Sequence, residues 1–465
     1  MRIKQISVVN LFGTFNHTIP LNLSERATIM IGPNGYGKTM ILKMVDGLFN
    51  GRFSIFFKIP FQEFAIYLDN GGYLKVEKRI FKKKKEGLPY ELNLLVSEDG
   101  ATSKRINLTN LDTARSREFY FLTRSLFEEE LMDRQVLNRL RHGLELDTDA
   151  YYSIIEKYWD IIDSEAIESK RMPSEIARYF RSEFGSKLLE IRTITKDLNV
   201  HFIQAQRLIS RPITKSDKKT EIEIPAVKLY SEELAKTIAD KLAQSTERAQ
   251  KLDSTFPHRV ISQPLPAGTR ETYKELRDQL QKLREKRIHL KETGILVELG
   301  GELEIPESIE DENRLNYLNG VLTEYVRDTQ EKLAIFDELS DKIEILKRII
   351  NDRFAPHKEL EINKDKGFVF ITSTGNELTP GDLSSGEQHE LVLLYELLFK
   401  VPAGSLVLID EPELSLHIAW QQQFLEDLLV ITEIAKLDVL IATHAPDIIH
   451  HHWPLTVDLG ESKAS

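Results

Sequence analysis

The chain contains no cysteine among its 465 residues. This absence excludes disulfide bonds, a thiol nucleophile and every zinc site built with cysteine ligands. The chain also lacks any apolar run near the roughly 18 residues that a membrane helix needs. Its first residues, MRIKQISVVNLFG, alternate as a strand does and do not resemble a signal peptide. We therefore expect a cytoplasmic protein without a membrane segment.

Basic charge is scarce relative to acidic charge, because 62 lysines and arginines face 73 aspartates and glutamates, a net charge of −11. Affinity for nucleic acid comes largely from neutralised phosphates, so this balance argues against a chain that coats DNA. Basic residues do gather in one region, at 82–85 and at Lys104, Arg105, Arg115, Arg117 and Arg124. A solvated loop is the usual meaning of such a run, and a phosphate-contacting edge is the alternative. Direct DNA binding therefore stays open.

The length and the apolar content predict two or three structural units. The first hundred residues predict strands around one helix, with a hairpin turn at Asn70-Gly71-Gly72. Helical spacing follows from about 115 to 200, and a short buried strand is expected within 199–210. We take 1–226 as the N-terminal part of an α/β unit.

Residues 227–354 predict a helical, coiled-coil insertion. Apolar residues follow a heptad seam at Tyr273, Leu276, Leu280, Leu283 and Leu290, and again at Ile343, Leu346 and Ile350. We expect Pro257, Pro264 and Pro266 to interrupt the helices, so that the arm turns back on itself.

Residues 355–465 predict the C-terminal part of the α/β unit. From 367 onward the strands GFVFITSTG, SLVLID, LDVLIATH and LTVDL are separated by turns and helices. This series is typical of a parallel sheet.

The stretch GPNGYGKT, residues 32–39, matches the phosphate-binding pattern G-x-x-x-x-G-K-[ST] at every required position. ATIMI before it predicts a strand, and KTMILKMVDGLF after it predicts a helix. Glycines let backbone N–H groups meet phosphates, while the lysine supplies positive charge and the threonine hydroxyl reaches Mg²⁺. The residues predicted to bind ATP and Mg²⁺ are Gly32, Pro33, Asn34, Gly35, Tyr36, Gly37, Lys38 and Thr39.

The stretch SLVLIDEPE supplies two carboxylates at the end of a predicted buried strand. Parallel sheets bind ligands at the carboxyl ends of their strands, so Asp410 is placed to hold Mg²⁺. We expect Glu411 to polarise the water that attacks the γ-phosphate.

Four motifs, GPNGYGKT, LSSGEQ, LIDEPELSLH and IATHAP, occur in the order of the ABC-type ATPases. With the helical insertion, the chain resembles the SMC, Rad50, RecF and OLD-like branch of that family. The resemblance implies an α/β ATPase head with a mixed N-terminal β lobe and a mainly parallel P-loop sheet, formed by 1–226 and 355–465. It also implies ATP hydrolysis.

In that family the turn before the signature helix contacts the γ-phosphate of ATP held by another protomer. Carried over here, Ser384 and Gly386 make this contact, Ser385 and Gln388 belong to the same turn, and the helix begins near Glu387. An N-cap serine without a ligand is the alternative.

Two further positions carry roles over from the family, and a third departs from its pattern. His444 matches the switch histidine that senses the γ-phosphate. Gln204 and Gln206 are both candidates for the glutamine that links Mg²⁺ to the insertion, and we select Gln206. The sequence Ser415-Leu416-His417 departs from the usual D-loop, which puts the cross-dimer contact of that loop in doubt.

Three adjacent histidines, His450, His451 and His452, lie near the end of the chain. No carboxylate lies at ligand spacing from them in the sequence, so we expect a solvated helix end rather than a metal site.

The chain most resembles the stand-alone ATPases of two-gene anti-phage modules, the AriA family of PARIS systems in particular. This implies a homo-oligomeric ATPase that controls a separate TOPRIM-type nuclease effector, AriB-like, and is triggered by a phage anti-restriction protein. Because 21 residues follow His444, we expect no nuclease domain in the chain itself. The alternatives are a Septu PtuA-like ATPase paired with an HNH nuclease and a RecF- or Rad50-like DNA-repair clamp.

Overall fold

The computed structural model describes residues 1–80, 90–98, 100, 103–108, 183–203, 225–262, 272–296, 312–415 and 418–460. The chain folds into two compact units. Met1–Ala205 and Val401–Ser465 form the first unit, and Gln206–Lys400 form the second. The second unit thus holds both the helical insertion and the signature turn, while the predicted boundaries at 226 and 354 stay predictions.

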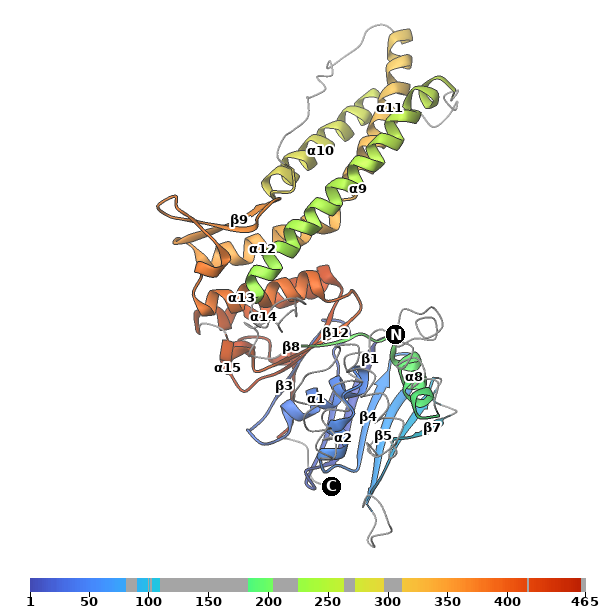
Figure 1. Ribbon diagram of the computed structural model, residues 1–465, viewed down its shortest axis with the longest axis vertical. Coiled ribbons are helices and arrows are strands. Elements are labelled where there is room, and N and C mark those ends of the chain that lie inside the picture. The colour runs from blue at the N-terminus through green and yellow to red at the C-terminus, as the bar shows by residue number, and fades with distance from the viewer. Residues whose placement is uncertain are drawn as a thin grey trace, which may run out of the picture. The chain divides into compact units, whose positions relative to one another are not determined.

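The first unit contains an antiparallel sheet of six strands in the order β2-β1-β4-β5-β6-β7 (Figure 1). Their bounds are β1 Ile3–Leu11, β2 Phe15–Pro20, β4 Glu63–Leu68, β5 Tyr73–Ile80, β6 Tyr90–Ser97 and β7 Lys104–Asn107. The predicted hairpin joins β4 to β5, and the Asn70 side chain accepts a hydrogen bond from the Gly72 N–H in its turn. The N-terminal β lobe is therefore confirmed.

The second sheet of the first unit is parallel throughout, in the order β14-β3-β13-β12-β8. The strands are β3 Ala27–Ile31, β8 Val200–Ile203, β12 Leu406–Asp410, β13 Asp438–Ala442 and β14 Thr456–Asp458. The central strands β12 and β13 are buried along almost their whole length because continuous apolar runs cover both faces. The predicted parallel P-loop sheet is confirmed.

One apolar core joins the two sheets through helix α1, Lys38–Phe49. Ile41, Met44, Val45 and Leu48 of this helix are fully buried, as the spacing of three and four predicts. Other described helices of the first unit are α2 Ser54–Lys58, α8 Glu183–Thr195, α14 Ile418–Ala435 and α15 Pro446–Ile449. The core therefore fixes the start of α1 against the strand ends.

The second unit is built on four helices, α9 Ala226–Ser262, α10 Tyr273–Glu292, α11 Glu312–Ala334 and α12 Asp337–Phe354 (Figure 1). Helix α11 packs beside both α9 and α10. Leu276, Leu283 and Leu290, seven residues apart, are the buried positions of α10, and Ile343, Leu346 and Ile350 are buried in α12. The helical insertion with its heptad seam is confirmed.

Pro257 was expected to interrupt the arm, and this expectation is wrong, because α9 continues through it. Two residues later, the Arg259 guanidinium donates to the Leu252 carbonyl of the preceding turns and to the carboxylates of Glu324 and Asp328 on α11. These contacts hold the helix across the position where proline removes one backbone hydrogen bond.

A small antiparallel sheet completes the second unit, in the order β11-β10-β9. Its strands are β9 Lys358–Asn363, β10 Gly367–Thr372 and β11 Glu377–Leu378. The strand GFVFITSTG was expected in the parallel sheet, and this is wrong: among the described strands, β10 pairs antiparallel with β9 and β11 and with no other. Both connections are short hairpin turns, and such turns join antiparallel neighbours rather than parallel ones.

Helix α13, Ser385–Tyr395, follows a 3₁₀ turn at Pro380–Asp382 and continues into a π-helical turn at Glu396–Lys400. Its second half is buried on every side, and this half includes Glu390, which pairs with the buried Arg353 of α12. Tyr395 stacks between the rings of Tyr230 and Phe399. Packing of this kind gives the exposed first turn of α13 a rigid support.

Candidate nucleotide-binding site

Three neighbouring parallel strands bring the predicted motifs of the first unit together. In the order β3-β13-β12, the P-loop follows β3, the switch histidine segment follows β13, and Asp410 ends β12. The Thr443 N–H donates to the Met30 carbonyl, which ties the end of β13 to β3. The carboxyl edge of the sheet is where parallel α/β sheets bind ligands.

The P-loop curls back to the N-terminus of α1. Gly37, directly before the helix, has φ 91°, and a Cβ there would also lie 2.5 Å from Leu11 Cδ2. Only glycine satisfies both conditions without strain. The Lys38 ammonium is buried and donates to the Gly32 carbonyl at 2.6 Å and to the Pro33 carbonyl at 3.3 Å. The loop therefore closes around its own lysine at the N-terminus of α1. Helix N-termini are favourable places for anions to bind.

His17 on β2 supports this loop, and its role was missed from the sequence. The buried ring donates from Nε2 to the Tyr36 carbonyl at 2.9 Å. Burial lowers the pKa of His17, although the hydrogen bond to Tyr36 opposes the shift. The hydrogen bond to the carbonyl requires a proton on Nε2. The available signal was a polar residue in phase with the apolar positions of a strand.

Thr39 and Asp410, the two residues predicted to bind Mg²⁺, lie in contact with each other. The Thr39 hydroxyl donates to Asp410 Oδ1 at 3.0 Å. Burial raises the pKa of Asp410, the Thr39 hydrogen bond lowers it, and the nearby Glu411 carboxylate raises it. A hydroxyl and a carboxylate are the hard oxygen ligands that Mg²⁺ prefers, and a bound cation would offset the cost of ionising this buried acid.

Glu411 has a backbone conformation that is rare for its residue type, with φ 45°. Its N–H donates to the Ala442 carbonyl of β13, which holds the turn in place. Its carboxylate lies 3.7 Å from Nδ1 of His444. Left-handed residues other than glycine cluster at functional sites, where the surroundings over-determine them. The two residues predicted to be catalytic are therefore brought together.

Glu413 holds the backbone of His444, the predicted switch histidine, and no role was predicted for Glu413 from the sequence. Its Oε1 accepts hydrogen bonds from the Thr443 hydroxyl at 2.9 Å and from the His444 N–H at 3.2 Å. The same oxygen lies 3.4 Å from Nδ1 of His444, and the side chain is only 7% exposed. A buried acceptor with these two hydrogen bonds fixes where the backbone of His444 lies.

The signature turn in the second unit is an exposed, capped helix start. Helix α13 begins at Ser385, two residues earlier than expected, and Ser384 is its N-cap in a capping box with Glu387. In the capping box the Ser384 N–H donates to the Glu387 carboxylate and the Glu387 N–H donates to the Ser384 hydroxyl. The N–H groups of Ser385 and Gly386 have no acceptor within the helix. A Cβ at Gly386 would meet nothing within 4 Å. The first turn is thus open to a ligand.

Two contacts stabilise this turn from the side. Lys358 donates to both carboxylate oxygens of Glu387 at 2.8 Å. Burial would raise the pKa of Glu387, but the hydrogen bonds from Lys358 and Ser384 outweigh it and lower the pKa. The Gln388 amide donates to the Leu383 carbonyl at 2.8 Å. Gln388 therefore shapes the turn in this state.

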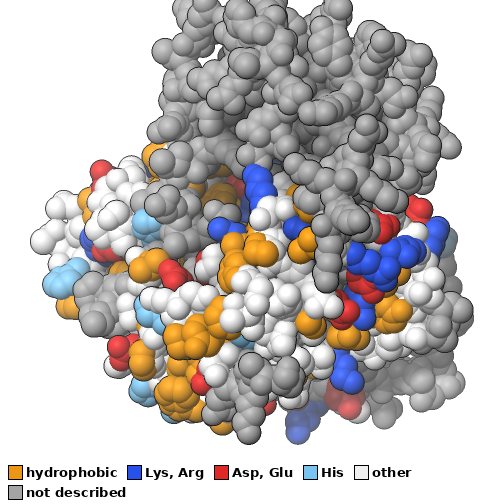
Figure 2. Space-filling model, turned by 90° about the horizontal axis from the view of Figure 1, so that it is seen from below, with side chains coloured by type: hydrophobic (Ala, Val, Ile, Leu, Met, Phe, Trp, Pro, Cys, Tyr) orange, Lys and Arg blue, Asp and Glu red, His pale blue; other side chains and the backbone are white. Residues whose placement is uncertain are grey.

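Several predicted positions lie outside the described residues: Gln204, Gln206, Leu416, His417, the lysines at 82–85, and Arg115, Arg117 and Arg124. Of the basic region, Lys104 and Arg105 are described, and they pair with Glu190 and Glu91. Basic and acidic side chains lie among one another on the face drawn in Figure 2. The described part of the basic region is therefore charge-compensated.

A family described as AAA ATPase domain matches residues 1–449. The chain belongs to this ATPase family. The match covers the P-loop, the signature turn, Asp410 and His444 together. No curated protein sequence matches the chain.

This AAA ATPase is similar to SMC heads among solved structures. One is the Smc head domain with an extended coiled coil bound to the C-terminal domain of ScpA from Pyrococcus furiosus, at 10% identity and TM-score 0.29 over 96% of this chain and 91% of that one. The SMC head domain from Thermotoga maritima has 9% identity and TM-score 0.29 over 97% and 91%. At these scores neither similarity carries an argument about activity or partners. In the part of the chain that the structure describes, no helix has the length and apolarity to cross a membrane.

Proposed function

We propose that this AAA ATPase binds and hydrolyses ATP at a site shared by two subunits, and that this switch controls a separate effector. One observation carries the proposal: the sheet edge of the first unit brings together Lys38, Thr39, Asp410, Glu411 and His444, and the second unit presents the open start of helix α13. The P-loop edge would bind ATP in one subunit, and the start of α13 in a second subunit would contact the same ATP.

ATP supplies the phosphoanhydride bond that is cleaved, and Mg²⁺ offsets its negative charge. Lys38 and the N–H groups at the start of α1 neutralise the phosphates. The Thr39 hydroxyl and the Asp410 carboxylate provide oxygen ligands for the cation. Glu411 accepts a proton from the attacking water, and His444, held by Glu413, donates a hydrogen bond toward the γ-phosphate.

The signature turn of the partner subunit completes the site. Ser384 contributes its hydroxyl, and Ser385 and Gly386 contribute N–H groups that no helix carbonyl accepts. The positive end of α13 faces the same anion. Hydrolysis removes the γ-phosphate from between the subunits, so the interface weakens and the assembly opens.

The effector proposed is a TOPRIM-type nuclease of the AriB kind, in an anti-phage system of the PARIS type that a phage anti-restriction protein triggers. The motif order together with a helical insertion of modest length supports this assignment. A Septu-type HNH nuclease and a DNA-repair exonuclease are the competing partners. Each predicts a different neighbouring gene.

The test is co-purification of the untagged product of the adjacent gene with the tagged Glu411→Gln chain, with and without ATP. Capture of a TOPRIM protein supports the proposed biology. Capture of an HNH nuclease or an exonuclease overturns it in favour of the matching alternative. The mass of the particle that the Glu411→Gln chain forms in solution, measured by light scattering, should at least double on addition of ATP. A particle mass that ATP leaves unchanged contradicts the shared site.

A further inference from the structure

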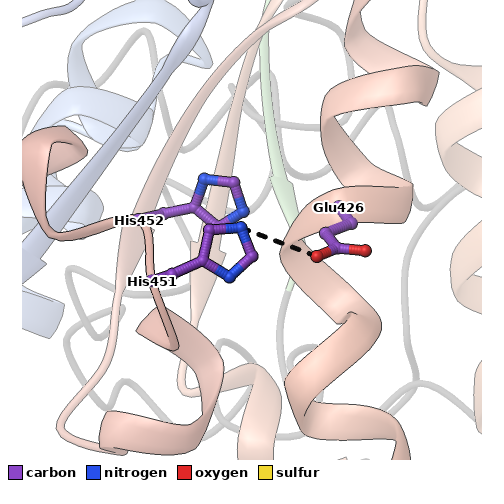
Figure 3. Close-up of side chains that lie close together, drawn as sticks. All are labelled: Glu426, His451 and His452. Carbon is purple, nitrogen blue, oxygen red and sulfur yellow. Dashed lines mark ion pairs between the residues drawn. The ribbon is translucent and has the colours of Figure 1, made fainter.

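The fold brings a carboxylate to the histidine run that the sequence left without one. His450, His451 and His452 follow α15, and Glu426 lies on α14. These two helices pack together, and the Gln422 amide donates to Asp447 between them at 3.3 Å. Figure 3 shows the His451 and His452 rings, carried by the loop, beside Glu426 on its helix.

The ligand atoms of this cluster lie near coordination distance of one another. One atom each from Glu426, His451 and His452 lies within 4.8 Å of the other two, and His451 Nε2 is 3.7 Å from Glu426 Oε1. Zinc bonds of about 2.0–2.2 Å place tetrahedral ligand atoms roughly 3.4 Å apart. The side chains of His451 and Glu426 are more than half exposed. Small torsions therefore close the cluster around an ion that enters from solvent.

The hydrogen bonding around the histidines is compatible with a metal ligand at His451. His450 Nδ1 and His451 Nδ1 lie 2.6 Å apart, so one of them carries a proton on that atom. When His451 is the donor, its Nε2 is unprotonated and faces Glu426. Zinc-bound histidines are oriented in this way by a partner at the other ring nitrogen.

His452 supplies the second sign of a missing partner. Its Nε2 atom is buried and makes no hydrogen bond with the described residues. The ring packs at 4.0 Å between centroids against His451. Buried polar atoms without a partner are rare and call for an ion or water that satisfies them.

We propose that Glu426, His451 and His452 bind a divalent transition-metal ion, for which Zn²⁺ is the best fit. Two imidazoles and one carboxylate with a fourth position open to water suit zinc, whereas Mg²⁺ prefers oxygen ligands alone. The site is therefore chemically distinct from the one at Thr39 and Asp410. A bound ion ties α14 to the segment that follows the switch histidine.

The test uses the full chain without a histidine tag, stripped of metals and then kept in excess Mg²⁺ without nucleotide. Calorimetric titration with Zn²⁺ should show one ion per chain, and Co²⁺ should give the visible absorption of a tetrahedral site. Glu426→Gln, His451→Ala and His452→Ala should each weaken Zn²⁺ binding at least about tenfold, since each removes a ligand. His258→Ala, an exposed histidine on α9, is the matched control and should bind as wild type.

Two results overturn the proposal: absence of saturable Zn²⁺ binding by the wild-type chain, or binding that the three cluster variants leave unchanged. Circular dichroism establishes that each variant is folded. If His452→Ala does not fold, the exposed positions Glu426 and His451 decide the outcome.

Discussion

The hydroxyl of Thr39 donates a hydrogen bond to Oδ1 of Asp410 over 3.0 Å, although 371 residues separate the two in the chain. The P-loop helix and the end of strand β12 thus present adjoining oxygen atoms at one edge of the parallel sheet. The predictions for Asp410, Glu411 and Glu413 below depend on that edge.

Asp410→Asn should abolish Mg²⁺-dependent hydrolysis. A catalytic metal contributes several kcal/mol, so the rate should fall about 100-fold or more in a phosphate-release assay. Retention of the wild-type rate in this variant would remove Asp410 from the metal site.

The same carboxylate should make Mg²⁺ binding depend on pH. Burial raises the pKa of Asp410 above its ordinary value of 3.8. Protons therefore compete with Mg²⁺ at a higher pH than at an exposed aspartate. By the same linkage, the metal-free protein loses stability as pH rises from 3.8 through the raised pKa of Asp410, because the buried carboxyl must ionise. Without metal, Asp410→Asn should therefore melt at or above the wild-type temperature at neutral pH. Added Mg²⁺ and ATP should stabilise only the wild type.

Glu411→Gln should bind ATP normally and hydrolyse it about 10²–10⁴-fold more slowly, because the base that takes the water proton is removed. Nucleotide binding by fluorescence and turnover by phosphate release separate the two effects. Glu433→Gln, an exposed glutamate of α14, is the control and should turn over at the wild-type rate. Unchanged turnover in Glu411→Gln would assign the base elsewhere.

Glu413→Ala should lower the turnover number about tenfold or more while changing the KM for ATP little. Its carboxylate positions His444 by accepting hydrogen bonds from the Thr443 hydroxyl and the His444 N–H, and hydrogen bonds to a charged acceptor contribute about 1.5–3 kcal/mol. Glu413→Gln keeps an acceptor for Thr443 and should recover part of the rate. If Glu413 only stabilised the fold, the variants would contain less folded protein and Glu413→Gln would not recover the rate in this way. Circular dichroism measures the folded fraction directly.

The buried Arg353–Glu390 pair supports the signature helix and should govern the stability of the second unit. The two side chains are 1% and 0% exposed. Glu390→Ala removes a buried anionic partner of the Arg353 guanidinium, which costs about 3–5 kcal/mol. Replacing both residues, as Arg353→Met with Glu390→Leu, should recover most of that loss in chemical denaturation. A single variant as stable as wild type would contradict the pairing.

The strands β3 and β12 and the helix α1 were predicted correctly from the sequence because local patterns determine them. The apolar runs before Gly32 and Asp410 and the spacing in α1 each occupy one short window. His17 and Glu413 could not be found in this way, because each acts on a residue that only the folded sheet brings near. Pro257 was misjudged because Arg259 joins α9 to α11 from a distance of more than sixty residues. The strand β10 was misjudged because pairing depends on β9, whose sequence KELEIN is charged and short.

Trans complementation tests the shared site most directly. Lys38→Ala removes the phosphate-binding lysine and Ser384→Arg blocks the signature turn, so each variant alone should be inactive. Random mixing makes mixed dimers in which one site has both intact halves, and activity should return to about a quarter of the wild-type level. Mixed dimers that are confirmed by differential tags but remain inactive would contradict the account.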